Sequence, residues 1–506
     1  MMQHSTLKIV IKRKISMKRI IYFIFLIAII GCNPPDNKSD NNKYSQEIED
    51  KIMRVIENLR VETQFWNQYE TSTLKERMSY YKTPGISIAV INNGNLEWAR
   101  GFGYKNIEKK ETVTQNTLFQ AASISKPIAA LAFMKLMENN EIDIDTNINN
   151  YLKSWQVPSN NGWIPNISLR QILSHTAGFT VHGFQGYSQT EEIPTTIQIL
   201  NGEYPANNDP VKVNILPGTR LRYSGGGITI AQLILEDKYD EPFYKIMDSL
   251  VLKPLKLENS TYQQPVPKIK NNLLAIGYLS DYQPIIGGNH IYPEMAAAGL
   301  WTSPTELSII VTEIQKAIED KSDFISAETI KEMLTPQKID SEVGIGFFLS
   351  GKGDSLMFQH NGGNYGFNSR IVGYLHQGKG AIVMINANTF EIINEVMRSI
   401  AIEYKWPDYS KENEKYALNE KSLESYSGRY ISEENWEIII AKQNDNLTLE
   451  MPQQLSVQLI PESENKFYCE QLNIKVEFIK TNNKVERLEI SQDWWKKIIA
   501  KRTENE

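Results

Sequence analysis

Hydrophobic residues recur at helical spacing at the start of the globular part of the chain, in the segment Ser45 to Phe65. The positions that would share one face are Ile48, Ile52, Ile56 and Leu59. A period near 3.6 residues places such positions on one side of a helix, so the pattern predicts an amphipathic helix here.

Two strand-like segments follow, Gly85 to Val90 and Leu96 to Tyr104. They are connected by Asn92-Asn93-Gly94-Asn95. An Asn-Gly pair between two such segments is typical of a tight turn, so we predict a β-hairpin.

Helical and strand-like patterns are segregated along the rest of residues 45–406. The predicted helices are Ile128 to Met137, Ile228 to Lys238, Pro304 to Asp320 and Phe390 to Glu403. The predicted strands of the second half are Val343 to Ser350, Asp354 to His360, Asn368 to Leu375 and Gly380 to Ala387. Strands at both ends with helices between them predict an α+β domain, in which helices flank a mainly antiparallel sheet and form an insertion.

The C-terminal part has a different pattern. Residues 407–422 are polar and include a proline, as is typical of a linker. Short strand patterns then recur at Trp436 to Ile440, Leu447 to Leu449, Val457 to Ile460, Lys475 to Phe478 and Val485 to Ile490. They predict a small all-β domain over residues 423–506, with Cys469 as a buried thiol.

The first 31 residues have the organisation of an export signal. The positive run Met17 to Arg19 precedes the apolar run Ile20 to Ile30, which is shorter than the roughly 20 residues that span a bilayer. With Gly31 before Cys32, the segment resembles a bacterial lipoprotein signal. The resemblance implies a lipid on Cys32, a polar tether over residues 32–44 and a location in the bacterial cell envelope, on the periplasmic or extracellular side.

Charge and histidine spacing limit the partners. The chain carries 54 Lys and Arg against 60 Asp and Glu, and loss of a signal with six basic residues and no acidic ones would leave 48 against 60, a net charge of −12. Such a surface disfavours nucleic acid as a partner. The six histidines show no paired metal-ligand spacing, so we expect neither a metal nor another cofactor.

The most informative chemical pattern is the pair Ser123 and Lys126, just before the helix predicted from Ile128. A separation of three residues places both side chains on one helical face, where the amine can deprotonate the hydroxyl. The free N–H groups and positive dipole end of a first helical turn favour the negative charge that then develops. The same pair can also be a capping serine beside a solvated lysine.

Two further segments carry candidate chemistry. Tyr223 ends an extended segment before a glycine turn, where its phenol can relay a proton if a neighbouring ammonium lowers its pKa. The segment Phe358 to Phe367 contains Gly362 and Gly363, which permit close backbone approach to a ligand and an N–H donor for an oxyanion. The alternatives are a packed tyrosine with a satisfied hydroxyl and a hairpin turn with a bystander histidine.

In this order and at these separations, the three elements resemble the β-lactamase and penicillin-binding serine hydrolases. The resemblance is strongest to the group of class C β-lactamases, D-alanyl-D-alanine carboxypeptidases and related esterases. Further blocks that agree with the family are Pro84 to Val90, Leu173 to Phe179 and Ala298 to Ser303. The resemblance covers residues 51–406. The C-terminal part, opening at Leu423 to Tyr430, is similar to the lipocalin-like β-domain often attached to such hydrolases.

The resemblance implies a role for each matching residue. Ser123 would be the acylated nucleophile, Lys126 its base, Tyr223 the proton shuttle, His360 with Asn361 and Gly362 the counterpart of the K/H-T-G motif, and the N–H groups of Ser123 and Gly363 the oxyanion hole. His175, in the block Leu173 to Phe179, is assigned a structural role in shaping a turn near the site.

Two positions depart from the family pattern. The Y-x-N motif is Tyr223-Ser224-Gly225 here, so the asparagine that would contact a substrate amide is absent, which argues against true β-lactamase activity. His360 replaces a lysine, and a neutral imidazole holds a substrate carboxylate less firmly than an ammonium does.

The sequence thus predicts a lipid-anchored serine hydrolase that forms an acyl-enzyme on Ser123. Its partner would be a small-molecule or peptide substrate, namely an ester, a D-amino-acid peptide or a lactam. The alternatives are a catalytically inactive penicillin-binding-like module that senses or binds cell-wall peptides, and an enzyme that transfers the acyl group to an amine instead of water.

Overall fold

The structure is a computed structural model. It describes residues 44–60, 71–160, 162–279, 281–338, 342–407, 409, 418–433, 435–443, 446–451, 456–469, 474–482, 484–491 and 497–503. The predicted signal over residues 1–31, the lipidation site Cys32 and the tether as far as residue 43 lie outside these residues. No helix in the described ranges is both long enough and apolar enough to cross a membrane.

Seven strands form one antiparallel sheet in the order β3-β2-β1-β9-β8-β7-β6. Their bounds are β1 Gly85–Asn92, β2 Asn95–Asn106, β3 Glu111–Thr112, β6 Phe348–Ser350, β7 Met357–Asn364, β8 Phe367–Tyr374 and β9 Gly380–Ile385. A separate two-stranded sheet pairs β4 Phe119–Gln120 with β5 Trp301–Thr302. Since β1 pairs with β9, the two ends of the α+β part of the chain meet in the middle of the sheet, and the predicted fold class is confirmed.

The predicted hairpin is confirmed between β1 and β2. Asn93 and Gly94 have φ of 51° and 69°. Positive φ at both central residues is what a two-residue type I′ turn requires, and asparagine and glycine tolerate it best.

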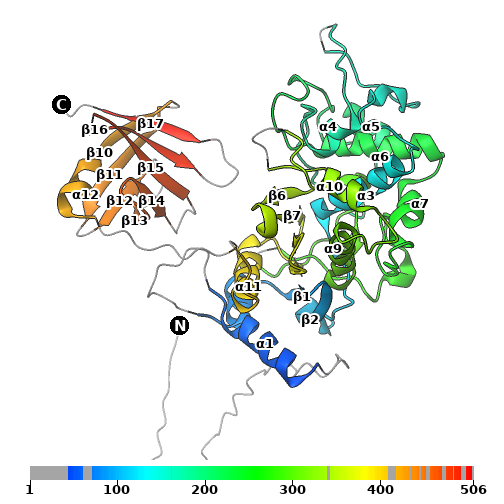
Figure 1. Ribbon diagram of the computed structural model, residues 1–506, viewed down its shortest axis with the longest axis horizontal. Coiled ribbons are helices and arrows are strands. Elements are labelled where there is room, and N and C mark those ends of the chain that lie inside the picture. The colour runs from blue at the N-terminus through cyan, green and yellow to red at the C-terminus, as the bar shows by residue number, and fades with distance from the viewer. Residues whose placement is uncertain are drawn as a thin grey trace, which may run out of the picture. The chain divides into compact units, whose positions relative to one another are not determined.

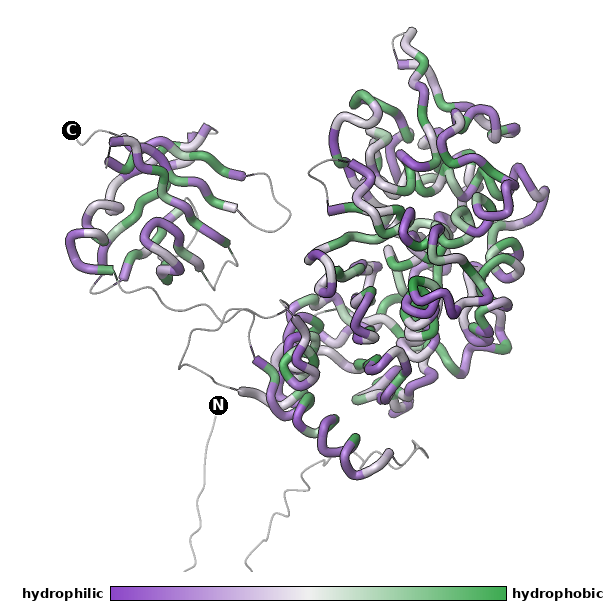
Figure 2. Tube along the Cα trace, viewed as in Figure 1, coloured by the Kyte–Doolittle hydropathy of each residue, from purple (hydrophilic) through white to green (hydrophobic). Residues whose placement is uncertain are grey.

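Helices cover both faces of the sheet (Figure 1). The helices of this part are α1 Gln46–Glu57, α2 Leu74–Tyr80, α3 Ser125–Glu138, α4 Leu169–Leu173, α5 Thr196–Asn201, α6 Gly225–Tyr239, α7 Phe243–Met247, α8 Met295–Ala298, α9 Pro304–Ile318, α10 Ala327–Met333 and α11 Phe390–Glu403. Residues of β9 alternate between two cores: Ile382 and Met384 pack with α3, α6 and α9, whereas Val383 and Ile385 pack with α1 and α11. Along α1, hydrophobic and hydrophilic stretches alternate, as expected of a helix with one buried face (Figure 2).

Several predicted bounds were wrong. Helix α1 ends at Glu57 and not at Phe65, because Leu59 exchanges backbone hydrogen bonds with Ser72 instead of continuing the helix. Helix α6 begins at Gly225 and not at Ile228, because the Ser224 hydroxyl accepts a hydrogen bond from the Gly227 N–H and caps a first turn made of glycines.

Two strand bounds also differ. Strand β6 begins at Phe348, because the residues from Val343 fold back in a turn in which the Gly344 N–H donates to the Phe347 carbonyl. Strand β7 begins at Met357 and continues to Asn364, so His360 and the glycines after it lie within a strand and not in a turn.

The C-terminal part forms a closed antiparallel barrel of eight strands, which confirms the predicted all-β fold of this part. The strands are β10 Gly428–Ser432, β11 Glu437–Gln443, β12 Asn446–Glu450, β13 Val457–Pro461, β14 Lys466–Cys469, β15 Ile474–Thr481, β16 Lys484–Ser491 and β17 Ile498–Arg502. The sequence analysis missed β10, β14 and β17. Helix α12, Glu420–Tyr426, begins inside the segment predicted as a linker, and its Tyr426 packs on Phe467 and Phe478 in the barrel core.

Candidate active site

Ser123 lies in a 3-10 turn, Ala122–Ile124 (η1), that leads directly into α3. It is partly exposed, whereas its neighbours from Ala121 to Phe133 are buried. Ala122 has φ of 51°, a left-handed conformation that is uncommon for a residue with a Cβ. A backbone conformation of this kind costs free energy and persists only where the surrounding structure holds it in place. Residues in such conformations are found most often at functional sites.

Lys126 follows in the first turn of α3 and is buried. Its side-chain nitrogen lies 2.9 Å from the Ser123 hydroxyl and donates a hydrogen bond of 2.7 Å to the Ala297 carbonyl, in α8. Burial lowers the pKa of Lys126 to about 7. Much of the amine is therefore unprotonated at neutral pH, as a base for Ser123 must be.

Tyr223 is brought to the same place from the segment before α6. Its phenol interacts with the Ser123 hydroxyl, and the centre of its ring is 5.0 Å from the Lys126 nitrogen. Burial raises the pKa of Tyr223 above its usual value, against a smaller lowering by Ser123. The sequence analysis made the relay conditional on a neighbouring ammonium that lowers this pKa, and that condition is not met, because desolvation of the phenolate raises the pKa. Tyr223 therefore keeps its proton at neutral pH.

Strand β7 passes alongside the turn that carries Ser123. A Cβ on Gly362 would lie 2.1 Å from the Ala121 carbonyl oxygen, so only glycine permits this approach. The Ser369 hydroxyl on β8 donates a hydrogen bond of 3.0 Å to the same carbonyl. Gly363, whose N–H is the predicted oxyanion donor, follows Gly362 on this strand. Asn361 precedes the two glycines and is exposed.

His360 is buried on β7, with its ring 6.2 Å from the Tyr223 ring and 5.5 Å from the Phe348 ring. Its Nδ1 lies 2.6 Å from the Asn361 carbonyl, an acceptor, so the proton of the neutral ring is on Nδ1. Burial and the nearby Lys126 lower its pKa to about 3. The ring is thus neutral, and its Nε2 is a buried acceptor with no partner among the described residues.

Position 225, where the Y-x-N pattern has asparagine, is tightly packed. A Cβ on Gly225 would lie 3.0 Å from the Phe184 ring and 3.1 Å from the His182 carbonyl. The Gly225 N–H donates to that carbonyl at 2.9 Å. A side chain at this position would therefore require the segment of His182 and Phe184 to move by a few tenths of an ångström.

The site also contains residues that the sequence analysis did not assign to it. The His182 ring lies 4.8 Å from the Tyr223 ring, and Phe348 lies 6.3 Å from it on another side of the cluster. Ala297 contributes its main-chain carbonyl, so its residue type gave no signal in the sequence.

Glu294, three residues before Ala297, is fully buried, and both of its carboxyl oxygens have no hydrogen-bond partner in the described ranges. Burial raises its pKa to about 8, so it is mostly protonated at neutral pH.

The described residues contain no group of three or more histidine, cysteine or acidic side chains arranged to hold a metal ion. The chemistry available in this arrangement is that of an alcohol beside an unprotonated amine and a protonated phenol.

An antiparallel sheet with helices on both faces, and a serine at a helix start beside a buried lysine and a tyrosine, define the penicillin-binding class of serine hydrolase folds. The chain matches the Beta-lactamase family model over residues 71–398 and belongs to that family. Residues 412–501 match a domain of unknown function, DUF3471, so the barrel has a known family but no known role.

Relatives agree with this membership at low identity. The chain is 21% identical to penicillin-binding protein 4* of Bacillus subtilis over 428 residues, which cover 80% of this chain and 91% of that protein. It is 23% identical to protein flp of Staphylococcus aureus over 317 residues, covering 60% of each.

Solved structures share the fold. An octameric penicillin-binding protein homologue from Pyrococcus abyssi matches with a TM-score of 0.58 and 20% identity, over 85% of this chain and 98% of that one. The D-amino acid amidase of Ochrobactrum anthropi matches with a TM-score of 0.54 and 18% identity, over 71% of this chain and 99% of that one.

Proposed function

We propose that this protein is a serine hydrolase that forms an acyl-enzyme on Ser123 and releases the acyl group to water. The observation that carries the proposal is the 2.9 Å contact between the Ser123 hydroxyl and a lysine whose pKa burial lowers to about 7. An alcohol is a weak nucleophile until a base takes its proton, and here a base in the right state touches it.

In the proposed reaction, the Ser123 oxygen attacks the substrate carbonyl carbon while its proton passes to Lys126. The N–H groups of Ser123 and Gly363 stabilise the oxyanion. Tyr223 gives its proton to the leaving group and receives one from Lys126, which returns to the amine form. Water then attacks the ester carbonyl on Ser123, and the same groups move the protons in reverse.

The proposed substrate is a small ester or amide without a carboxylate near the scissile bond. His360 is neutral and presents an acceptor nitrogen, and a neutral acceptor gives a carboxylate no favourable contact. Position 225 is glycine, so it offers no amide side chain to a substrate, and the packing around it is tight. Amides of D-amino acids belong in the substrate panel, because a structural relative is named as a D-amino acid amidase.

The alternative is a module that binds cell-wall peptides without turnover. The retained Ser123, Lys126 and Tyr223 cluster speaks against it, because binding alone needs no buried, partly unprotonated lysine against the hydroxyl.

The test uses the purified full-length chain with p-nitrophenyl esters, D-amino acid amides, D-Ala-D-Ala peptides and a chromogenic cephalosporin. A fluorophosphonate probe, followed by mass spectrometry, locates the reactive residue. We expect one adduct, on Ser123, and turnover of at least one ester or amide. Ser123→Ala should lose both, whereas Ser125→Ala, two residues on, should keep the adduct. Unchanged turnover by Ser123→Ala would refute the proposal, and added amines that compete with water would indicate acyl transfer.

We also propose that Cys32 carries a lipid and anchors the enzyme in the bacterial cell envelope, facing the periplasm or the exterior. The apolar run before Gly31-Cys32 supports this. Metabolic labelling with a palmitate analogue should mark the wild-type chain and not Cys32→Ser, with Cys469→Ser as the matched control. A labelled Cys32→Ser chain would exclude this anchor.

A further inference from the structure

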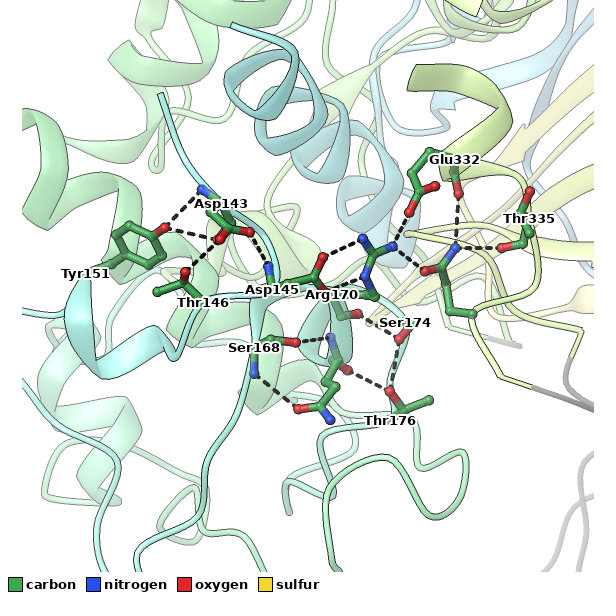
Figure 3. A network of polar contacts seen from close by, with 12 residues as sticks. Asp143, Asp145, Thr146, Tyr151, Ser168, Arg170, Ser174, Thr176, Glu332 and Thr335 are labelled. Carbon is green, nitrogen blue, oxygen red and sulfur yellow. Dashed lines mark hydrogen bonds and ion pairs between the residues drawn. The ribbon is translucent and has the colours of Figure 1, made fainter. Parts of the chain in front are cut away.

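Arg170 and Ser174 at the end of α4, and Thr176 after it, lie in a network of polar contacts (Figure 3). His175 stands between Ser174 and Thr176 in the chain. Arg170, on α4, pairs with Asp145 through two hydrogen bonds of 2.6 and 2.7 Å and also with Glu332 on α10. The Ser174 hydroxyl donates to the Arg170 carbonyl at 2.7 Å and contacts the Thr176 hydroxyl at 3.0 Å. Arg170 thus ties α4 to the turn that carries Asp145 and to α10, and the Ser174 and Thr176 side chains contact each other on either side of His175.

His175 accepts hydrogen bonds from the backbone N–H groups of both chain neighbours of Tyr223. Its carbonyl accepts a hydrogen bond of 2.8 Å from the Arg222 N–H, and its ring Nδ1 accepts one of 3.2 Å from the Ser224 N–H. Its ring lies 4.3 Å from the Tyr223 ring, the shortest ring separation in the aromatic cluster around that tyrosine. One residue thus contacts the segment before Tyr223, the segment after it and the side chain itself.

The protonation state of His175 leaves its Nδ1 able to accept the hydrogen bond from Ser224. Because Nδ1 accepts from a backbone N–H, the proton of the neutral ring is on Nε2. Burial, reinforced by Lys126, His360 and His182, lowers its pKa well below the usual value. The ring therefore keeps Nδ1 as an acceptor across the working pH range, since protonation there would break the bond to Ser224.

We propose that His175 is a positioning residue, which holds the Tyr223 phenol against Ser123 by binding the backbone N–H groups of Arg222 and Ser224. This inference rests on the proposed function, because it gives His175 a task only if Tyr223 transfers a proton. It also goes beyond the turn-shaping role that the sequence suggests. Proton transfer is sensitive to position, and a displacement of about 1 Å can cost roughly a hundredfold in rate.

The test compares two substitutions that both tolerate the backbone of His175, whose φ is 57°. His175→Gly removes the ring and the acceptor without backbone strain. His175→Asn keeps an acceptor oxygen near the place of Nδ1, and asparagine adopts this conformation readily. We expect His175→Gly to lower kcat about a hundredfold with KM changed less than about threefold. His175→Asn should recover to within about tenfold of the wild type.

A double-mutant cycle with Tyr223→Phe decides whether His175 acts through Tyr223. We expect Tyr223→Phe to lower kcat and the double variant with His175→Gly to be no slower than Tyr223→Phe alone. Effects that multiply would overturn the inference, because His175 would then act independently of the phenol. Normal turnover by His175→Gly beside an impaired Tyr223→Phe would overturn it too, while leaving the proposed function intact.

The remaining outcomes are also decisive. Normal turnover by Tyr223→Phe would refute the proton-transfer role in the proposed function and the inference together. If circular dichroism shows that His175→Gly does not fold, His175→Asn alone decides. Losses of His175→Asn and Tyr223→Phe that multiply in their double variant would then overturn the inference.

Discussion

The Lys126 side-chain nitrogen donates a hydrogen bond of 2.7 Å to the Ala297 carbonyl. This buried bond holds one N–H of the amine against a main-chain carbonyl. The same nitrogen is 2.9 Å from Ser123, so its lone pair is available to the hydroxyl when the amine is unprotonated. Since no carboxylate pairs with Lys126 in the described ranges, burial alone sets the direction of its pKa shift.

The first prediction concerns the pH dependence of turnover. Lys126 must be unprotonated to act as the base, so kcat/KM should rise with pH and reach half its plateau near pH 7. Burial raises the pKa of Tyr223, so the plateau should extend to at least about pH 10 without loss of the phenolic proton. The measurement is kcat/KM for a neutral ester between pH 5 and 10, corrected for spontaneous hydrolysis. A half-maximum near the ordinary lysine value would contradict the assignment.

The second prediction concerns the stability cost of Lys126. Its pKa is lowered from 10.5 to about 7 on folding, so between these values the unfolded chain binds a proton that the native chain does not. Stability should therefore rise with pH from about 7 to about 10.5 and be lower, but constant in this contribution, below about 7. Lys126→Met should abolish turnover and raise the free energy of unfolding at pH 7 by about 1–4 kcal/mol.

The control for this prediction lies on the same helix. Lys135 is partly exposed and pairs with Glu138 at 3.0 Å, so Lys135→Met should give no such gain. Urea unfolding of the three chains at pH 7 and pH 10 makes the comparison. An equal gain from both substitutions would show that burial of Lys126 is not the cause.

The third prediction concerns substrate charge. His360→Lys places an ammonium where the structure has a neutral ring, so kcat/KM for a carboxylate-bearing peptide relative to its carboxamide should rise about tenfold or more. The new charge should also lower the pKa of Lys126 further, which moves the acid limb of the pH profile below 7. His360→Gln, which stays neutral, is the matched control. An unchanged ratio in His360→Lys would show that this position does not contact the leaving side of the substrate.

The fourth prediction concerns an ion pair that holds α2 against α11. Arg77 donates to Glu395 at 2.7 and 2.6 Å, and Tyr81 donates to the same carboxylate at 2.8 Å. The Glu395 side chain is 3% exposed, so Arg77→Ala leaves a buried charge unpaired and should cost about 3–5 kcal/mol.

The control is Arg54, which pairs with Glu403 on the same helix α11 but is 53% exposed. Arg54→Ala should cost much less than Arg77→Ala, because solvent screens that pair. Chemical denaturation of both variants gives the two values. A loss from Arg77→Ala no larger than that from Arg54→Ala would mean that Glu395 finds another partner or takes up a proton.

The sequence by itself determined features that depend on near neighbours in the chain. The spacing of Ser123 and Lys126 placed both at one helix start, and the Asn93-Gly94 pair specified the β1–β2 hairpin. The order of strand and helix patterns gave the α+β class with an antiparallel sheet. Hydrophobic periodicity and turn chemistry act within a few residues, so they can be read without knowing the remote contacts.

Only the tertiary structure decided the electrostatics of the site. The pKa directions of Lys126, Tyr223 and His360 follow from burial by segments distant in sequence, and for Tyr223 burial raises the pKa that the relay considered from the sequence would need lowered. The bonds from His175 to both neighbours of Tyr223 and from Lys126 to Ala297 likewise join residues that no local pattern connects. Desolvation and such bonds depend on which surfaces meet in the folded chain, so they are fixed when the sheet and its helices assemble and not before.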